Sequence, residues 1–265
     1  MNLSSGKKQK MSCNNLKFEA KTSETARNIA TILGVRINGT STSQVLGFVA
    51  QAIRFRQAPR LIFTPNAEFL VAAFKDKEFA QVLNQSDVNA PDGSGLIVLS
   101  RLVGQKLPER VSGADLVKAL LEIGNQEEWQ VGIVGARRGE IDEKKELFER
   151  LRIKYPKVVF TDLDNPRLKV ESSKFKIVFA CQGMGKQEKW ILENKDKIKA
   201  NVFIGVGGSL DFLTGFTKRA PGWIQNAGLE WLWRGLTKPG HWKRVYTAVV
   251  VFPWLVFREK VTSSK

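Results

Sequence analysis

The amino-acid sequence predicts an α/β fold, in which a largely parallel sheet is flanked by helices on both sides. Apolar runs of strand length alternate along the chain with amphipathic segments of helix length. These runs are almost continuously apolar, which is typical of strands buried on both faces of a sheet. With 265 residues and 43% hydrophobic content, the chain can form one large core with an appendage.

The predicted elements begin with a strand and a helix. The run LIFTP at 61–65 has the length and apolarity of a buried strand, and the mixed sequence at 66–85 has the length of an amphipathic helix. A second helix is predicted at 112–124, where apolar and polar residues again alternate in groups. The apolar run WQVGIVGA at 129–136 is the next predicted strand.

The same alternation continues through the second half of the chain. The charged segment 139–154 is a predicted helix, and the apolar runs KVVFTDL at 157–163 and FKIVFAC at 175–181 are predicted strands. A helix at 186–199 and the strand NVFIGVG at 201–207 complete the pattern. Strands that alternate with helices in this way are typical of a parallel sheet.

The turns that follow these strands are where we expect a ligand. In open parallel sheets, ligands bind beyond the carboxyl ends of the strands. The turn sequences are TPN, VGARRGE, CQGMGKQE and GVGGSLDF, which are rich in glycine, amide and charged residues. Backbone N–H groups at such turns and at helix N-termini can bind a phosphate group.

The composition restricts the function classes. The formal charge of +16 favours an anionic partner, whether nucleic acid, a phosphorylated substrate or an acidic membrane surface. The two cysteines, Cys13 and Cys181, lie in a polar tail and at the end of an apolar run, which favours a reduced, cytoplasmic chain. A single histidine, His241, excludes a histidine-rich metal site and argues against a Ser-His-Asp triad.

The two ends of the chain differ from its centre. Residues 1–20 are expected to be a disordered polar tail, 21–215 a catalytic core, and 216–265 a C-terminal appendage that binds membranes. The appendage carries nine Lys/Arg, two Glu and five of the seven tryptophans, a mixture that suits a membrane interface. Its longest apolar run, VYTAVVVFPWLVF, is too short to span a bilayer as a helix.

Asp92 is a candidate catalytic base. In NAPDGSGLIVLS it lies between a proline and a Gly-Ser-Gly turn, directly before an apolar run. An ordinary Pro-Asp-Gly turn explains the same residues. A base is the alternative, because the glycines would let a substrate approach closely. The local sequence leaves both interpretations open.

A second candidate is GMGKQEKW at 183–190. Gly183 and Gly185 precede a helix whose first turn carries Gln187 and Glu188. The pattern is compatible with a simple glycine turn. It is also compatible with a diphosphate or sugar site at a helix N-terminus, with the Gln187 amide holding a hydroxyl group.

Two further motifs are weaker. Asp162 and Asp164 form a D-x-D pattern that resembles the metal site of some sugar transferases, but Asn165-Pro166 after it favours a turn. The glycines at 132–140 and 205–212 do not form G-x-G-x-x-G after the first strand, which argues against a dinucleotide-binding dehydrogenase.

Six blocks in order carry a family resemblance: TPNAEF, APDGSGLIVLSRLVG, PERVSGADL, GMGKQEKWI, GVGGSLDFLTG and KRAPGWIQNAGLEWLWRGLTKPGHWKR. Across residues 30–247 the sequence resembles the WecG/TagA/CpsF family of bacterial glycosyltransferases. The resemblance implies a Rossmann-like core and a C-terminal membrane-binding appendage. It also implies inverting sugar transfer from a UDP-sugar to a polyprenyl-diphosphate-linked sugar, in cell-surface polysaccharide or teichoic acid synthesis, without a metal or other cofactor.

The resemblance also implies the site residues and the location. We expect the enzyme on the cytoplasmic face of an anionic membrane, either as a single chain or as a homo-oligomer. One departure is His241, where the family often has arginine. The expected catalytic residues are Asp92 as the base, with Thr64, Asn66, Arg110 and Gln187. The expected substrate-binding residues are Gly183, Gly185, Glu188, Gly207, Asp211, Arg234 and Arg244.

Two other functions compete with this one. A strongly basic chain with interleaved aromatic residues can bind single-stranded nucleic acid. We predict no nucleic-acid partner, because the basic and aromatic residues concentrate at one end beside an apolar run. The other alternative is a protein that binds a UDP-sugar without catalysis.

Overall fold

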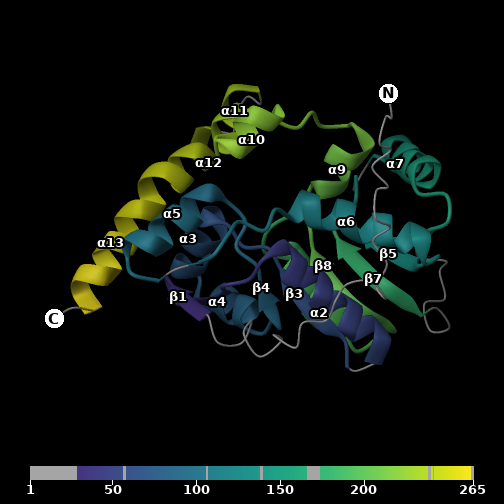
Figure 1. The fold of residues 1–265 in the computed structure, drawn as a ribbon, viewed down its shortest axis with the longest axis horizontal. Helices are drawn as coiled ribbons and strands as arrows, with labels where there is room; N and C mark the ends of the chain where they lie inside the picture. The colour runs from purple at the N-terminus through teal and green to yellow at the C-terminus, as the bar shows by residue number, and fades with distance from the viewer. Residues whose placement is uncertain are drawn as a thin grey trace, which may run out of the picture.

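The computed structural model describes residues 29–55, 58–105, 107–137, 140–165, 174–237, 240 and 242–263. The tail expected at 1–20 lies outside the described residues. A six-stranded parallel sheet forms the centre of the molecule, with helices on either side (Figure 1). Its strands, in spatial order, are β4 (Val88–Asn89), β3 (Arg60–Phe63), β8 (Ala200–Gly205), β7 (Phe175–Ala180), β5 (Gln130–Val134) and β6 (Val159–Asp162). The predicted α/β class with a largely parallel sheet is confirmed.

Successive residues of the strands enter two different apolar clusters. In β3, Leu61 and Phe63 belong to one cluster and Ile62 to the other, because side chains alternate between the faces of a strand. One face is covered by α3 (Ala67–Lys75), α4 (Lys77–Asn84) and α8 (Lys186–Asn194). The opposite face is covered by α2 (Thr42–Phe55), α6 (Gly113–Gln126) and α7 (Ile141–Lys154). Burial on both faces explains why most strand residues are apolar.

The predicted strands and helices match those of the structure, except that one predicted helix is divided in two. The helix expected at 66–85 is two helices, because Asp76 ends α3 and its carboxylate accepts a hydrogen bond from the Phe79 N–H at the start of α4. Four elements of the core were not predicted: β4, α2, α5 (Ser94–Leu102) and α9 (Ser209–Thr214). An antiparallel hairpin of β1 (Ile29–Ile32) and β2 (Val35–Asn38) was also missed.

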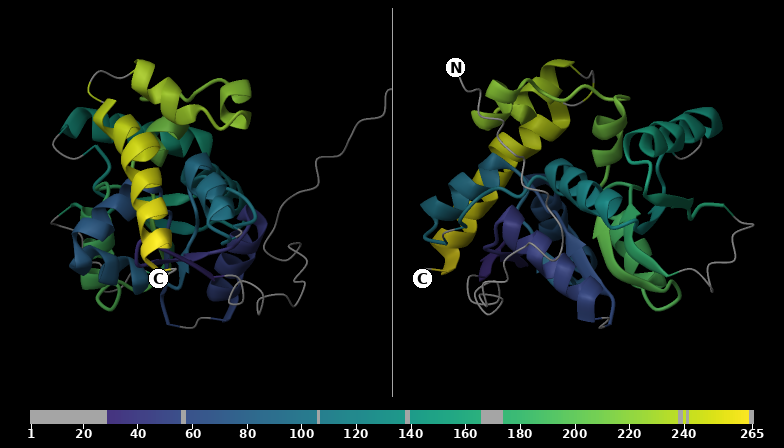
Figure 2. Two further views of the ribbon diagram at one scale, coloured as in Figure 1. Left: turned by 90° about the vertical axis from the view of Figure 1, so that its left-hand side faces the viewer. Right: turned by 45° about the vertical axis from the view of Figure 1, so that its right-hand side comes forward.

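The C-terminal segment, residues 216–265, is helical where it is described. It follows α9 (Ser209–Thr214) and contains α10 (Gly222–Asn226), α11 (Glu230–Thr237), α12 (Trp242–Tyr246), the π-helix η2 (Thr247–Val251) and α13 (Phe252–Ser263). The run from α12 to α13 lies beside α3 and α5 at one end of the molecule (Figures 1 and 2).

One side of this helical run is part of the core. Phe252, Leu255 and Val256 are buried in the same apolar cluster as α3, α4 and α8. The opposite side exposes large apolar residues, including Trp254 and Phe257. Among the described residues, no helix combines the length and apolarity needed to cross a bilayer.

Candidate functional site

A cavity of about 590 Å³, the larger cavity, lies at the carboxyl ends of β3, β4, β7 and β8. This is the edge of the sheet at which the sequence predicts a ligand. Arg234 lies in α11, but its side chain is outside the described part of the chain. The predicted site residues that line the larger cavity are Thr64, Asn66, Asp92, Arg110, Gly183, Gln187, Gly207, Asp211 and Arg244.

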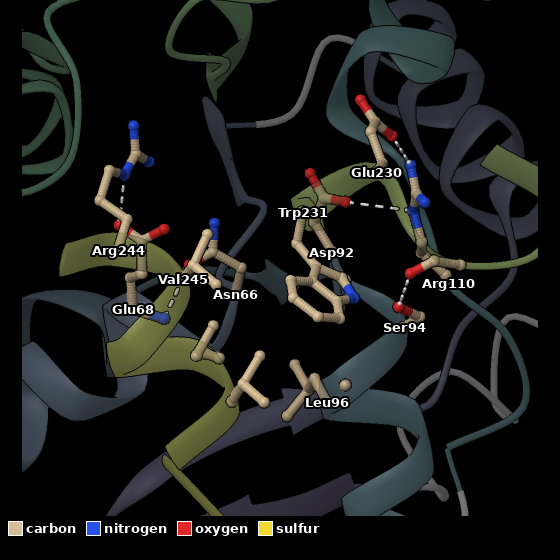
Figure 3. A pocket seen from close by; sticks show the side chains of 16 residues that line it. Asn66, Glu68, Asp92, Ser94, Leu96, Arg110, Glu230, Trp231, Arg244 and Val245 are labelled. Carbon is tan, nitrogen blue, oxygen red and sulfur yellow. Dashed lines mark hydrogen bonds and ion pairs between the residues drawn. The ribbon is translucent and has the colours of Figure 1, made fainter. Parts of the chain in front are cut away.

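The backbone around Asp92 directs its carboxylate into the cavity. The Asp92 N–H donates a hydrogen bond to the Pro65 carbonyl at 2.9 Å, which joins the turn after β4 to the turn after β3. Gly93 follows with a φ of 121°, a conformation that side-chain-bearing residues rarely adopt, and α5 begins at the next residue. Figure 3 shows Asp92 facing the open space between Asn66 and Arg110. The glycine therefore shapes the turn that presents the acid.

Arg110 and a backbone amide contact the Asp92 carboxylate. The Arg110 Nε atom is 3.4 Å from Asp92 Oδ1, and the Gly113 N–H donates a hydrogen bond of 3.4 Å to Oδ2. Arg110 also donates a hydrogen bond of 2.9 Å to Glu230 Oε2. Glu230 belongs to the C-terminal segment and is 7% exposed. These contacts hold the Asp92 carboxylate in one orientation at the cavity wall.

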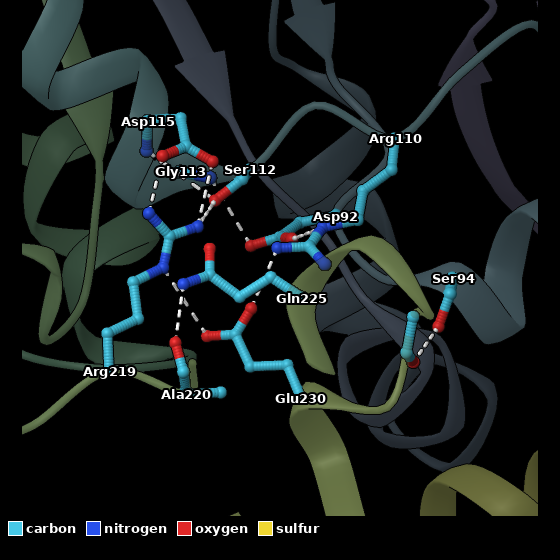
Figure 4. A network of polar contacts seen from close by, with 11 residues as sticks. Asp92, Ser94, Arg110, Ser112, Gly113, Asp115, Arg219, Ala220, Gln225 and Glu230 are labelled. Carbon is cyan, nitrogen blue, oxygen red and sulfur yellow. Dashed lines mark hydrogen bonds and ion pairs between the residues drawn. The ribbon is translucent and has the colours of Figure 1, made fainter. Parts of the chain in front are cut away.

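The polar contacts continue from Glu230 through a second arginine. Glu230 Oε1 is 3.8 Å from Arg219 Nε, and Arg219 binds the carboxylate of Asp115 through both terminal nitrogens (Figure 4). The hydrogen bond from Arg219 lowers the pKa of Asp115, and the same bond raises the pKa of Arg219. Alternating charges thus run from Asp92 through Arg110, Glu230 and Arg219 to Asp115.

Thr64 and Asn66 follow β3 and have structural partners. The Asn66 side chain caps α3 by accepting hydrogen bonds from the backbone N–H groups of Glu68 and Phe69. The Thr64 hydroxyl donates to the Gly205 carbonyl at 3.3 Å. Both residues therefore help to fix the carboxyl ends of β3 and β8 beside the cavity.

Gln187 and Glu188 connect two glycine-rich turns. Glu188 Oε2 accepts a hydrogen bond of 2.7 Å from the Gly185 N–H, and its Oε1 accepts one of 2.6 Å from the Gln187 amide. The side-chain oxygen of Gln187, Oε1, accepts a hydrogen bond from the Gly207 N–H at 2.9 Å. Burial raises the pKa of Glu188 to about 7, although these hydrogen bonds act in the opposite direction. Glu188 is fully buried beside the cavity, and Gly185 lies in the adjoining turn.

Two further predicted residues that line the cavity, Asp211 and Arg244, form ion pairs. Asp211 Oδ1 is 3.2 Å from the Nε of Arg137, whose guanidinium lies 4.3 Å from the Phe216 ring centroid. Arg244 donates a hydrogen bond of 2.7 Å from Nε to Glu68. The first contact joins α9 to the turn after β5, and the second joins α12 to the first turn of α3.

Asp162 and Asp164 bind a lysine. The Lys144 ammonium is 2.8 Å from Asp164 and 3.3 Å from Asp162. Burial alone would lower the pKa of Lys144, but the hydrogen bond and charge of Asp164, with those of Asp162, raise it. Among the residues that the structure describes, no three metal-ligating side chains come together. In the structure, the two carboxylates of the D-x-D pattern thus form ion pairs with Lys144.

A second, smaller cavity of about 140 Å³ adjoins the larger one (Figure 3). Both cavities share the wall residues Asn66, Glu68, Asp92, Arg110, Glu230 and Arg244. The residues that line only the smaller cavity come from the start of α3, from Gly93 and the first turn of α5, from Gly228 and α11, and from α12 and η2. Asp92 is therefore accessible from two sides.

Comparison with known proteins identifies the family. The model of the glycosyl transferase WecG/TagA/CpsF family matches residues 30–265. The chain belongs to this family. It is similar to the N-acetylglucosaminyldiphosphoundecaprenol N-acetyl-beta-D-mannosaminyltransferase of Bacillus subtilis (strain 168), with 32% identity over 193 residues that cover 70% of this chain and 74% of the relative. The protein of the same name from Staphylococcus aureus (strain MRSA252) is 28% identical over 240 residues, 86% of this chain and 92% of the relative.

Membership of the WecG/TagA/CpsF family makes this chain a glycosyltransferase, as the sequence predicts. The family match includes the C-terminal segment, so Glu230 and Arg219 lie within it. Sequence reasoning missed both residues as site components. A signal was present for Glu230, because it is one of only two acids among the last 50 residues of a basic segment.

Proposed function

We propose that this enzyme transfers N-acetylmannosamine from a UDP-sugar to a GlcNAc-diphosphoundecaprenol acceptor, with inversion, in teichoic acid or related cell-surface polysaccharide synthesis. The names of its relatives supply the sugar and the acceptor. The observation that carries the proposal is the Asp92 carboxylate, which faces the larger cavity beside Arg110. A single-displacement transfer needs one such base.

Asp92 is the base in this mechanism. It removes the proton from the acceptor hydroxyl as that oxygen attacks the anomeric carbon of the donor. Arg110 Nε at 3.4 Å and the Gly113 N–H orient the carboxylate before the reaction. General-base catalysis of this kind contributes about 10²–10⁴-fold to the rate.

The departing UDP needs positive charge and N–H donors. The turns at Gly183 and Gly207 line the larger cavity and offer backbone groups, while Gln187 holds these two turns together. Lys218 and Arg244 line the same cavity and supply cationic charge. We therefore expect full activity in the presence of a chelator. Asp211 near the nucleotide ribose and Arg234 near a diphosphate stay predictions.

The C-terminal segment is the membrane-binding surface in this proposal, and it places the enzyme on the cytoplasmic face of the membrane. Large apolar side chains line the outer side of the run from α12 to α13 and are at least 44% exposed. Exposed aromatic and apolar residues beside basic ones suit an interface with anionic lipid. The outer-face residues are Trp242, Tyr246, Val249, Val250, Trp254, Phe257 and Val261.

Family membership favours this enzyme over a protein that binds single-stranded nucleic acid. A protein that binds UDP-sugars without catalysis is distinguished by its products. The test is incubation of the full chain with UDP-N-acetylmannosamine and a short-chain GlcNAc-diphospholipid, followed by measurement of UDP and of the disaccharide lipid.

The decisive variant is Asp92→Asn, which keeps the shape of the side chain and removes its basicity. We expect turnover to fall by at least about 10²-fold while UDP binding changes little. Asp142→Asn is the matched control, because Asp142 is an exposed acid on α7 away from both cavities. If Asp92→Asn kept full turnover, the assignment of Asp92 as the base would be wrong. If the wild-type enzyme transferred no sugar, the proposed reaction itself would be wrong.

A further inference from the structure

The smaller cavity is polar at one end and apolar at the other. Its polar end contains the six wall residues that it shares with the larger cavity, including Asp92. At the other end the cavity is lined by the hydrocarbon side chains of Leu96, Val245, Ala248 and Val249. Figure 3 shows Leu96 and Trp231 on the side of Asp92 that is remote from Glu230. A ligand that fits both ends must be amphipathic.

The apolar end leads to the outer surface of the protein. Leu96 is fully buried, whereas Val249 lines the cavity and is also 44% exposed on the outer face of η2. Val249 therefore belongs both to the cavity wall and to the row of apolar side chains on the outer face of α12–α13. A hydrocarbon chain can pass from that face into the cavity without leaving apolar surroundings.

The wall of the smaller cavity is held by specific contacts. The Ser94 hydroxyl donates a hydrogen bond of 2.6 Å to the Gly228 carbonyl, which ties the first turn of α5 to the segment before α11. Arg110 and Glu230 tie the same segment to the turn beside Asp92. Phe252, directly after η2, is fully buried in the core. The cavity therefore has fixed walls on both sides.

The two cavities differ in volume, so they can hold ligand groups of different size. The larger cavity, of about 590 Å³, lies in the range of sites that bind whole small molecules. The smaller cavity, of about 140 Å³, has room for a small apolar group. Building on the proposed function, we propose that the smaller cavity binds the isoprenyl unit nearest the diphosphate of the acceptor lipid, with that diphosphate beside Arg244.

The alternative occupant is the acetamido group of a sugar. An acetamido group carries an amide that needs hydrogen-bond partners, and the side chains Leu96, Val245, Ala248 and Val249 offer none. The cavity also reaches the exposed Val249, so that a group bound in it can continue to the outer surface. An isoprenyl unit satisfies both features, because it is apolar and continues into a longer chain.

The test compares soluble acceptors in the absence of membranes. GlcNAc-diphosphate esters that carry a methyl, a C5 prenyl or a C10 geranyl group are used as acceptors, with UDP release as the measurement. We expect kcat/KM of the wild-type enzyme to rise at least about tenfold from the methyl to the prenyl ester, because an apolar group becomes buried. Ala248→Phe fills the apolar end and should abolish this gain, so that the ratio of kcat/KM for the prenyl ester to that for the methyl ester falls to about one.

Val98→Phe is the control, because Val98 is exposed on α5 and lines neither cavity. It should keep the full prenyl gain. If Ala248→Phe does not fold, Ala248→Met makes a smaller addition at the same place. A photoreactive group on the first isoprenyl unit tests the wild-type enzyme directly and should label residues 245–249.

The possible failures are distinguishable. If the wild-type enzyme transfers sugar to every ester at the same rate, or if Ala248→Phe keeps the prenyl gain, the subsite is wrong and the proposed transferase stands. Photolabelling confined to other segments overturns the subsite in the same way. If the wild-type enzyme uses none of the esters and no full-length lipid acceptor, the proposed function itself fails and the subsite with it.

Discussion

Glu188 should make the stability of the protein depend on pH. Its carboxyl group is fully buried, and burial raises its pKa from an ordinary 4.5 to about 7. Because the folded-state pKa is the higher one, the stabilising contribution is fully present below about pH 4.5 and is lost as the pH rises through about 7. The difference corresponds to about 3 kcal/mol, at about 1.4 kcal/mol for each pKa unit.

The measurement is urea unfolding at several pH values. Between about pH 5.5 and about pH 7.5, the free energy of unfolding should fall by about 2 kcal/mol. Few other groups titrate in this range, because the chain has a single histidine. Glu188→Gln removes the titrating group, so its stability should change little over the same interval.

Glu193→Gln is the matched control, because Glu193 is an exposed acid on the same helix. This variant should keep the slope of the wild-type protein. A Glu188→Gln variant with that same slope would refute the assignment of the pH dependence to the buried carboxyl group. The overall stability of Glu188→Gln is a separate quantity, since the amide cannot accept both of the original hydrogen bonds.

Three further outcomes are expected. Gly205→Ala should lower the free energy of unfolding by about 1–3 kcal/mol, because the added methyl group would lie 2.9 Å from the Gln187 side-chain amide. Gly47→Ala is the control: Gly47 faces open space on α2, so this change should raise the free energy of unfolding by up to about 1 kcal/mol. Lys144→Met should destabilise by about 1–3 kcal/mol in urea unfolding, since it leaves two adjacent carboxylates without their cation. Trp254→Ser with Phe257→Ser should weaken co-sedimentation with anionic vesicles while the circular dichroism spectrum is unchanged; unchanged sedimentation would contradict the membrane surface.

The sheet could be predicted from the sequence because its strands are buried on both faces. Most residues of β5, β7 and β8 are apolar at successive positions. Each strand can therefore be recognised from its own sequence, without knowing which strands lie beside it. The two-residue strand β4 gives no such pattern, and its place beside β3 is fixed by pairing across the chain. The helix α5 follows the Asp92 turn as an apolar run, which resembles a strand as much as a buried helix.

The position of the candidate site at the carboxyl ends of the strands could also be predicted from the sequence. Residues in turns after strands, such as Asn66 and Gly207, follow from the topology of a parallel sheet. The partners of Arg110 and Arg219 do not, because Glu230 is 120 residues from Arg110 in the chain. Contacts between residues so far apart in the chain depend on how the C-terminal segment packs against the core. No local sequence pattern gives this information.

The Glu230 contacts change how a shortened enzyme should be interpreted. A chain that ends before α11 would lose the acid that binds Arg110, and it would also lose Phe252 from the core. If such a chain were inactive, the cause could be the loss of the contact that positions Arg110 beside Asp92, as well as the loss of the proposed membrane-binding surface. In our proposal, attachment to the lipid surface and assembly of the reaction centre both depend on this one segment, so only point variants on its outer face can separate them.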